Sequence, residues 1–311
     1  MRAALLLPGA GRFAGQPLSD PVAAALGRAQ RMGDGAPGRR AQLGRHFRLV
    51  PDHWPVAALT RDADAGDAAG SAWLRADPCH VRPDINGARL LAVGDALALD
   101  AADVEALLPA LRPLFGDAGV PIDAPVPARW YLRLPHESKW PAFSSPDDAL
   151  GADLFEHLPL AGDARRWRSL LSEAQVVLHN HPWNAQRAAR GLPVVNSLWF
   201  WGGGVLPDHV ESPHSRYSGD DETGIALAHA AGILGAPQQC FASGEADAVY
   251  DLATCRDLAA LERDWLQPAL SALRSGDLQE LWIDTADGLR WSLARGQRWR
   301  WWRRPRPDFA G

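Results

Sequence analysis

Residues 163–204 read DARRWRSLLSEAQVVLHNHPWNAQRAARGLPVVNSLWFWGGG, and this stretch decides the fold that we expect. Apolar residues recur at helical spacing in its first part, which predicts an amphipathic helix that begins at the N-cap Asp163 and stops before Pro182. A second, short helix should end at Gly191, since glycine readily adopts the left-handed conformation that follows a helix. The mostly apolar run 194–201 then predicts a central buried strand that leads into a flexible glycine turn.

Polar side chains stand just before this predicted glycine turn. In α/β folds such an edge commonly binds ligands, because backbone amides can approach an anion where no Cβ intervenes. The alternative is that these side chains only cap backbone groups in a helix–turn–strand connection. The candidate ligand-binding residues of the stretch are His181, Asn184, Arg187, Asn196, Gly202, Gly203 and Gly204.

The same stretch carries the pattern L-x-x-H-P-x-N-x-x-R-x-x-x-G-x-P-x-x-N, followed by a hydrophobic strand and G-x-G. This pattern resembles the archaeal-type cofactor-independent phosphoglycerate mutases, in which the segment leads from an inserted domain back into an alkaline-phosphatase-like core. Trp201 stands where that family usually has arginine. The chain as a whole also resembles a shorter bacterial family, that of the regulatory protein RpfE. The pattern is formed here by Leu178, His181, Pro182, Asn184, Arg187, Gly191, Pro193, Asn196, Gly202 and Gly204.

The resemblance implies the fold class α/β, with an alkaline-phosphatase-like three-layer core and an inserted small α/β subdomain. Residues 1–70 and 192–311 would form the discontinuous core, and residues 71–191 would form the insert. Arg75 matches the arginine of a strand in the inserted domain of the mutases. We therefore add Arg75 to the candidate ligand-binding residues.

Hydrophobic patterning predicts the remaining elements of both parts. The insert should contain a hairpin that turns at Asn86-Gly87, because this dipeptide favours tight turns between strands. The other expected strands are 3–7, 54–59, 120–123, 130–134, 278–284, 289–294 and 298–303, and the other expected helices are 21–31, 100–114, 225–234 and 257–273.

The metal ligands of the resembled enzymes are not matched. Those enzymes need two divalent metals and a serine nucleophile, and Asp and His residues from both ends of the chain bind the metals. Pro8 stands where the mutases have a metal-binding Asp, and residues 251–257 replace a D-x-x-G-H-x-x-D motif without a histidine. No histidine follows His229, while His179 and His181 lack an identifiable third ligand. We therefore expect no catalytic residue, no metal ligand and no cofactor.

The composition is that of a soluble globular protein, with 47% apolar and 22% charged residues in a chain of 311. A net charge of −5 gives no general attraction to polyanions, so we expect neither nucleic acid nor membrane as a partner. A small phosphorylated ligand or a protein partner is expected instead. Three scattered cysteines form no disulfide or zinc pattern. The apolar run 3–7 is too short for a signal peptide or membrane span, which predicts a cytoplasmic protein.

The C-terminal segment 289–307 contains seven arginines and no acidic residue, and tryptophans are interleaved with them. Such a mixture is typical of stacking platforms for single-stranded nucleic acid. Its alternation with period two is instead typical of a half-buried strand, with Trp299 and Trp301 in the core. We expect the strand.

These observations predict a catalytically degenerate phosphoglycerate-mutase-like protein with a regulatory, ligand-binding or partner-binding role. One alternative is an active cofactor-independent phosphoglycerate mutase or phosphatase whose metal ligands we do not recognise. Another alternative is nucleic-acid or partner binding through segment 289–307. Bound divalent metal would separate the first two, and salt-dependent polyanion binding would identify the third.

Overall fold

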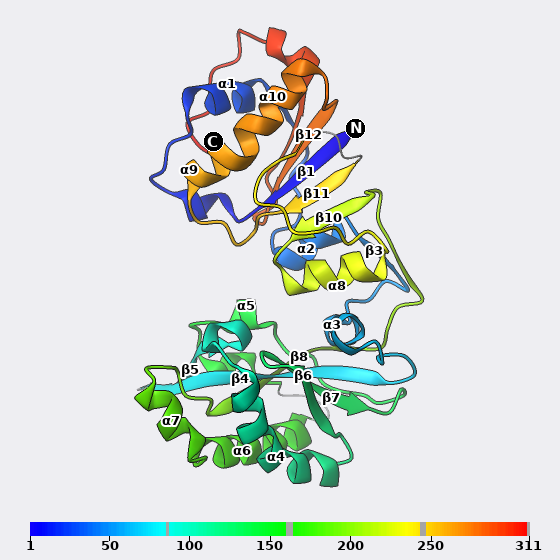
Figure 1. Cartoon of the computed structure of the whole chain (residues 1–311), viewed down its shortest axis with the longest axis vertical. Coiled ribbons are helices and arrows are strands. Elements are labelled where there is room, and N and C mark those ends of the chain that lie inside the picture. Colours follow the sequence, from blue (N-terminus) through cyan, green and yellow to red (C-terminus); the bar gives the residue numbers. More distant parts are fainter. Residues whose placement is uncertain (85–86, 160–163, 243–246, 310–311) are drawn as a thin grey trace. The chain divides into compact units, whose positions relative to one another are not determined.

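The computed structural model describes residues 1–84, 87–159, 164–242 and 247–309 of the chain. The predicted N-cap Asp163 and the turn residue Asn86 lie outside these ranges. The chain divides into two units (Figure 1). We call Met1–Asp52 with Asp208–Gly311 the core unit, and His53–Pro207 the inserted unit.

The core unit is built on a six-stranded sheet with the order β10-β11-β1-β12-β13-β2. Strands β10, β11, β1 and β12 run parallel, whereas β13 and β2 pair antiparallel with their neighbours. β1 is buried from Ala3 to Leu7, which is typical of a parallel strand paired on both sides and covered on both faces. The strands are β1 (Arg2–Leu7), β2 (Gln30–Arg31), β10 (Arg216–Gly219), β11 (Ala248–Asp251), β12 (Glu280–Thr285) and β13 (Arg290–Ala294).

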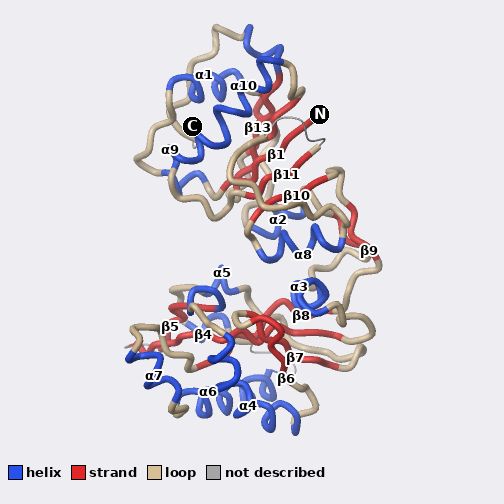
Figure 2. Tube along the Cα trace, viewed as in Figure 1, coloured by secondary structure: helices blue, strands red, loops and turns tan. Residues whose placement is uncertain are grey.

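Helices cover both faces of this sheet, which gives the expected three-layer arrangement (Figure 2). On one face, Leu26, Leu261 and Leu273 from three helices form one hydrophobic cluster with Leu5 and Leu281 of the sheet. Helices α2 and α8 lie on the other face. The helices are α1 (Asp20–Arg28), α2 (Arg39–Gly44), α8 (Glu222–Ala230), α9 (Leu258–Leu261) and α10 (Gln267–Ser275), and a separate pair of short strands is β3 (Arg48–Val50) with β9 (His209–Glu211).

The inserted unit is an antiparallel sheet in which the long strand β4 has neighbours along its whole length. β4 pairs with β7 and β8 in its first part and with β5 in its last part, which confirms the predicted hairpin between β4 and β5. Helices α4 and α6 pack on one face of this sheet through Phe115 and Trp167, while α3 packs on the other through Val56 and Ala57. The elements are α3 (Val56–Ala65), β4 (Ala72–Asp84), β5 (Gly87–Val93), α4 (Ala101–Asp117), β6 (Ile122–Val126), β7 (Arg129–Leu134), α5 (Pro146–Ala149), α6 (Ala164–His179), α7 (Trp183–Ala189) and β8 (Ser197–Gly204).

The boundaries between the units fall at 52/53 and 207/208, whereas the expected boundaries were 70/71 and 191/192. Residues 53–70 and 192–207 belong with the inserted unit because α3 packs on β8, and β8 pairs with β4.

Three local expectations are wrong. Residues 54–59 do not form a strand, because α3 begins at Val56. Within this helix the Thr60 hydroxyl donates a hydrogen bond to the Val56 carbonyl at 2.8 Å. The glycines 202–204 do not form a flexible turn, because they are the last residues of β8. Residues 298–303 do not form a strand, and Trp299 and Trp301 are exposed.

Among the described residues, no helix combines the length and the apolar character that crossing a bilayer would require.

Candidate functional site

Arg187 of the predicted ligand set is wholly buried in the inserted unit. Its guanidinium donates from Nη1 to Asp103 Oδ2 at 2.5 Å, from Nη2 to the Leu97 carbonyl at 2.6 Å and from Nε to the Pro193 carbonyl at 2.9 Å. Burial alone would raise the pKa of Asp103, but hydrogen bonds from Arg187 and Trp183 hold that pKa below its usual value. The guanidinium thus joins α4, α7 and the approach to β8.

The two asparagines of the set bind backbone groups. Asn184 donates to the carbonyls of Leu178 (2.8 Å) and Val195 (2.9 Å) and accepts from the Val195 amide at 2.8 Å. Asn196 accepts from the Val81 amide at 2.8 Å and donates to its carbonyl at 2.7 Å, as a strand neighbour would. Both asparagines thus cap backbone groups, which is the alternative to ligand binding that the sequence left open.

His181 and Arg75 also have partners within the inserted unit. His181 Nδ1 accepts from the Trp183 amide at 3.2 Å, which begins α7. Arg75 is buried in β4, donates to Asp77 Oδ1 at 2.8 Å and faces the ring of Trp201 at 5.1 Å. Trp201 donates in turn to Asp77 Oδ2 at 2.6 Å, so this tryptophan completes a buried network.

The three glycines of the set allow close packing. A Cβ at Gly203 would lie 2.5 Å from Trp140 Nε1, and one at Gly204 would lie 2.4 Å from Pro55 Cβ. Gly202 has φ +66°, a left-handed conformation that side chains disfavour. The structure therefore brings His181, Asn184 and Arg187 together around α7 and places Arg75 and the glycines in the sheet. Ligand binding by these eight residues stays a prediction.

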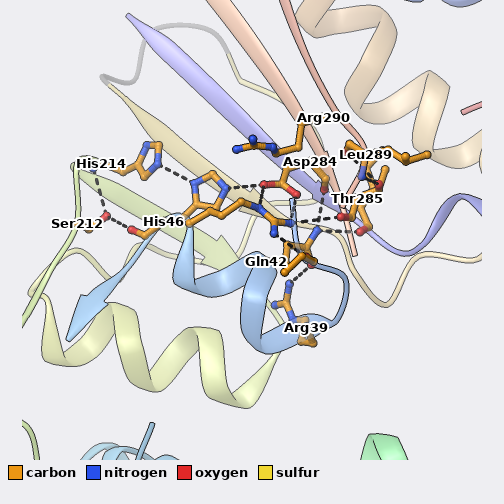
Figure 3. A network of polar contacts seen from close by, with 12 residues as sticks. Arg39, Gln42, His46, Ser212, His214, Asp284, Thr285, Leu289 and Arg290 are labelled. Atoms are coloured by element: carbon orange, nitrogen blue, oxygen red, sulfur yellow. Dashed lines mark hydrogen bonds and ion pairs between the residues drawn. The ribbon is translucent and has the colours of Figure 1, made fainter. Parts of the chain in front are cut away.

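A second polar cluster lies in the core unit, at the carboxyl ends of its parallel strands. β11 ends at Asp251, β12 carries Asp284 as its last residue but one, and Asp221 follows β10. The carboxyl edge of a parallel sheet is where α/β folds usually place ligands. Helix α2 and the residues after it supply the side chains that meet these carboxylates, and Figure 3 shows the part of the cluster around Asp284.

Two side chains, those of Arg45 and His46, contact the Asp284 carboxylate, and Figure 3 labels His46 and Asp284. Arg45 forms a bidentate pair with it, from Nε to Oδ2 at 2.7 Å and from Nη2 to Oδ1 at 2.6 Å. His46 Nε2 lies 3.3 Å from Asp284 Oδ2. Burial alone would raise the pKa of Asp284, but these hydrogen bonds outweigh burial and hold the pKa below its usual value.

His46 continues to a second buried histidine. His46 Nδ1 lies 3.0 Å from His214 Nε2, and the two rings are tilted by 35° (Figure 3). Burial, with the charge of His46 as a further cause, lowers the pKa of His214 to about 4. His214 is therefore neutral near pH 7, so the chain Asp284–His46–His214 can pass a proton but keeps no charge at its far end.

Asp251 pairs with a different arginine, although burial outweighs this pair and raises the pKa of the Asp251 carboxyl. Arg39 ion-pairs with Asp251 and also lies 3.3 Å from Asp221. The Tyr217 hydroxyl donates to Asp251 Oδ2 at 2.5 Å, and burial together with the Asp251 carboxylate raises the pKa of Tyr217, which keeps the phenol protonated. Gln42 accepts from Arg39 at 2.8 Å, and its amide donates to the carbonyls of Leu7 and Asp284, which joins the ends of β1 and β12.

The donor set at this edge does not fit the two divalent metals that the family resemblance implies. Each buried carboxylate already accepts from a guanidinium, which can only donate and repels a cation. Pro8, which follows β1 at this edge, offers no ligand. Within the described ranges, no group of three His, Cys, Asp or Glu side chains could hold a metal ion. We therefore derive no reaction step through a metal.

Sequence reasoning missed α2 and with it Arg39, Gln42, Arg45 and His46. The sequence does contain a signal for these carboxylates. Two apolar runs lead into an aspartate, AVYD at residues 248–251 and LWID at residues 281–284. Parallel strands bring such carboxylates to one edge, and buried carboxylates require cationic partners.

The sequence matches no protein-family model. A stretch of 62 residues, 20% of this chain, is 36% identical to a 2,3-bisphosphoglycerate-independent phosphoglycerate mutase of Methanothrix thermoacetophila. The match spans only 16% of the length of that mutase.

One solved structure extends the comparison to the fold, and a second is less similar. The PH0037 protein of Pyrococcus horikoshii has a TM-score of 0.50 and 13% identity, over 94% of this chain and 87% of its own. The cofactor-independent phosphoglycerate mutase of Thermoplasma acidophilum has a TM-score of 0.43 and 15% identity, over 94% of this chain and 89% of its own. The expected fold class is confirmed, while the narrower likeness to the RpfE type stays a prediction. The chain thus shares its α/β fold with the PH0037 protein, and one segment of its sequence is similar to a 2,3-bisphosphoglycerate-independent phosphoglycerate mutase.

Proposed function

We propose that the chain is a catalytically degenerate phosphoglycerate-mutase-like protein with a regulatory role, which binds a small phosphorylated ligand or a protein partner and does not transfer phosphoryl groups. The observation that carries this proposal is the pairing of Asp251 and Asp284 with Arg39 and Arg45.

The physical argument concerns what those arginines replace. In a two-metal site the cations bind the phosphoryl oxygens and lower the pKa of the attacking hydroxyl. A guanidinium can neutralise a carboxylate, but it has no vacant coordination position with which to activate a nucleophile. The pKa of Arg39 is raised, because its ion pairs with Asp251 and Asp221 outweigh burial, so it stays charged and cannot serve as a base. Arg39 and Arg45 therefore pair with the buried carboxylates but supply neither a base nor a vacant coordination position.

The test measures metal and activity on the same preparation. We expect elemental analysis to find no stoichiometric manganese, magnesium or zinc, chelators to leave the melting temperature unchanged, and mutase and phosphatase assays to give no turnover with added metal. Two equivalents of bound metal together with turnover of a phosphoglycerate would overturn the proposal.

For the ligand, His181 is the member of the predicted set with a free polar group. Its Nδ1 accepts from the Trp183 amide, while its other ring nitrogen has no hydrogen bond within the described residues. A phosphorylated ligand that binds the folded state should raise the melting temperature by mass action. We expect His181→Ala to reduce this rise with only a small loss of basal stability, because the bond to the Trp183 amide is lost as well; an unchanged rise would remove His181 from the site.

An active phosphoglycerate mutase is the second candidate, favoured by the 62-residue match to such an enzyme. Metal content separates it from the first. We also propose a cytoplasmic location and a place among the RpfE-type bacterial proteins, on the sequence patterns alone.

A further inference from the structure

Three tryptophans stand out on the surface of the core unit. Trp299, Trp301 and Trp302 expose 66%, 78% and 66% of their surface. Exposed large apolar groups that cluster in one place usually mark an interaction site. Their exposure removes one of the two reasons for setting nucleic acid aside, namely the expectation that Trp299 and Trp301 are in the core.

The backbone around these rings is fixed against α1. Arg303 Nη1 donates to the Ala29 carbonyl at 2.7 Å, and the Arg306 amide donates to the Ala23 carbonyl at 3.0 Å. The Arg304 carbonyl lies so near Gly27 that a Cβ there would come within 2.1 Å of it. The segment is therefore tightly packed, and the exposed rings are not those of a loose tail.

The end of the segment is anchored as well. The Leu18 amide donates to the Pro307 carbonyl at 2.8 Å. Phe309 is buried, with ring centroids 6.0 Å from both Phe13 and Trp291. Anchored ends hold the three tryptophans outside the core in a fixed arrangement.

A basic pocket adjoins the tryptophans. Its apolar wall includes Ala25 of α1, Leu270 and Leu273 of α10, and Leu293 of β13. Among the described residues, none of those that line the pocket is acidic. Arginines from three elements surround this wall: Arg28, Arg274, Arg295 and Arg298.

These four arginines are the charged residues of the pocket lining. Within the part of the chain that the structure describes, none of the four forms an ion pair, and the buried Nε of Arg28 has no hydrogen-bond partner. Arg298 lies over the ring of Trp299 at 4.9 Å, which links the pocket to the tryptophans. The net charge of −5 belongs to the whole chain, whereas segment 289–307 has seven arginines and no acid.

We infer that this face of the core unit binds single-stranded nucleic acid. Bases stack on the exposed indole rings, and the arginines of the pocket and of the segment bind the phosphates. Unpaired bases offer free faces to the rings, whereas those of a duplex are stacked on each other. An anionic membrane fits less well, because membrane-binding surfaces carry Leu or Phe beside Trp, while the exposed Leu91, Leu150, Val176 and Leu234 lie in other elements.

The test is fluorescence anisotropy of a labelled single-stranded oligonucleotide of about 12 nucleotides, titrated with the full chain over a salt series. We expect binding that weakens steeply with salt. The exposed double variant Trp301→Ala/Trp302→Ala should weaken binding at least about tenfold, since each stacked base contributes about 1–3 kcal/mol. Its melting temperature should not change. Val176→Ala, an equally exposed apolar site on α6, is the control that should bind normally.

The arginines are tested separately by the salt dependence. For single strands the slope of log K against log salt is about −0.7 per phosphate bound, so Arg298→Ser/Arg304→Ser should reduce its magnitude by about 1.4. Arg165→Ser, an exposed arginine on α6, should leave the slope unchanged.

Four results would overturn the inference. They are no salt-sensitive binding at micromolar protein, equal affinity for inorganic polyphosphate, affinity that survives loss of both tryptophans, and binding to phosphatidylserine vesicles without binding to the oligonucleotide.

Discussion

Two arginine–aspartate pairs in this molecule share their chemistry and differ in their setting. Arg187 of the inserted unit is wholly buried, and its donors end on Asp103 and on two carbonyls. Arg45 of the core unit forms a bidentate pair with Asp284, but 15% of its side chain is exposed at the carboxyl edge of the sheet. The first arginine belongs to a sequence motif and holds the fold, while the second belongs to no motif and sets the charge of the candidate site. Membership of a motif therefore does not indicate which arginine lies at the candidate site.

The largest expected effect is that of Arg187→Ala. It leaves the buried Asp103 carboxylate without its cation, which costs about 3–5 kcal/mol of unfolding free energy. Equilibrium unfolding in guanidinium chloride measures this loss. Arg190→Ala is the matched control on the turn after α7, because its pair with Asp100 is half exposed and should contribute less than about 1 kcal/mol. Equal losses in the two variants would contradict the contrast between buried and exposed pairs.

Arg45→Ala should cost somewhat less, about 2–4 kcal/mol, because water can partly solvate the Asp284 carboxylate that it uncovers. The variant also tests the site, since it removes the cation that stands in the way of metal. We expect any manganese affinity to rise above that of the wild-type chain, measured by calorimetry. Arg48→Ala, whose pair with Glu211 is exposed, is the control for stability. A stable Arg45→Ala protein would show that the pair contributes nothing to the fold.

The pH dependence of the unfolding free energy should reveal the buried His214 of the core unit, for which the described residues of the inserted unit have no counterpart among the lowered pKa values. The pKa of His214 falls from 6.5 to about 4 on folding, so the unfolded chain binds the proton more tightly. Stability is therefore fully present above pH 6.5 and is lost as the pH falls toward 4, by about 1–3 kcal/mol. Asp284 and Asp103 have lowered pKa values, so their contribution is lost only at lower pH, below the ordinary carboxyl range.

His214→Gln should flatten the unfolding free energy between pH 6.5 and 4 while it keeps a hydrogen bond to His46. His136→Gln, at an exposed histidine of the inserted unit, should leave the curve as it is. An unchanged slope in His214→Gln would mean that another group titrates.

Hydrophobic periodicity predicted those features of the fold that depend on a single stretch of the chain. The stripe Trp167, Leu170, Leu171, Ala174 and Leu178 is buried on α6 as expected, and Gly191 has the predicted left-handed φ of +73°. α2 is only six residues long and follows a glycine-rich loop, so its apolar pattern is too short to detect. The pairing of Arg39 and Arg45 with carboxylates more than 200 residues away depends on tertiary structure, which no local pattern contains.

The smallest expected effect is that of Trp301→Ala on stability, and it separates two tryptophans ten residues apart. Trp291 on β13 is buried against Phe309, with Arg31 over its ring, so Trp291→Ala should cost about 3–5 kcal/mol. Trp301 lies in a turn with most of its surface in water, so its removal should change the unfolding free energy by less than about 0.5 kcal/mol. Alternation of Arg and Trp made the two positions look equivalent, but the strand ends at Ala294 and the period-two pattern loses its meaning beyond it. Chemical denaturation of both variants measures the difference. A loss above about 2 kcal/mol for Trp301→Ala would mean that this ring is buried, as the alternation of Arg and Trp had indicated.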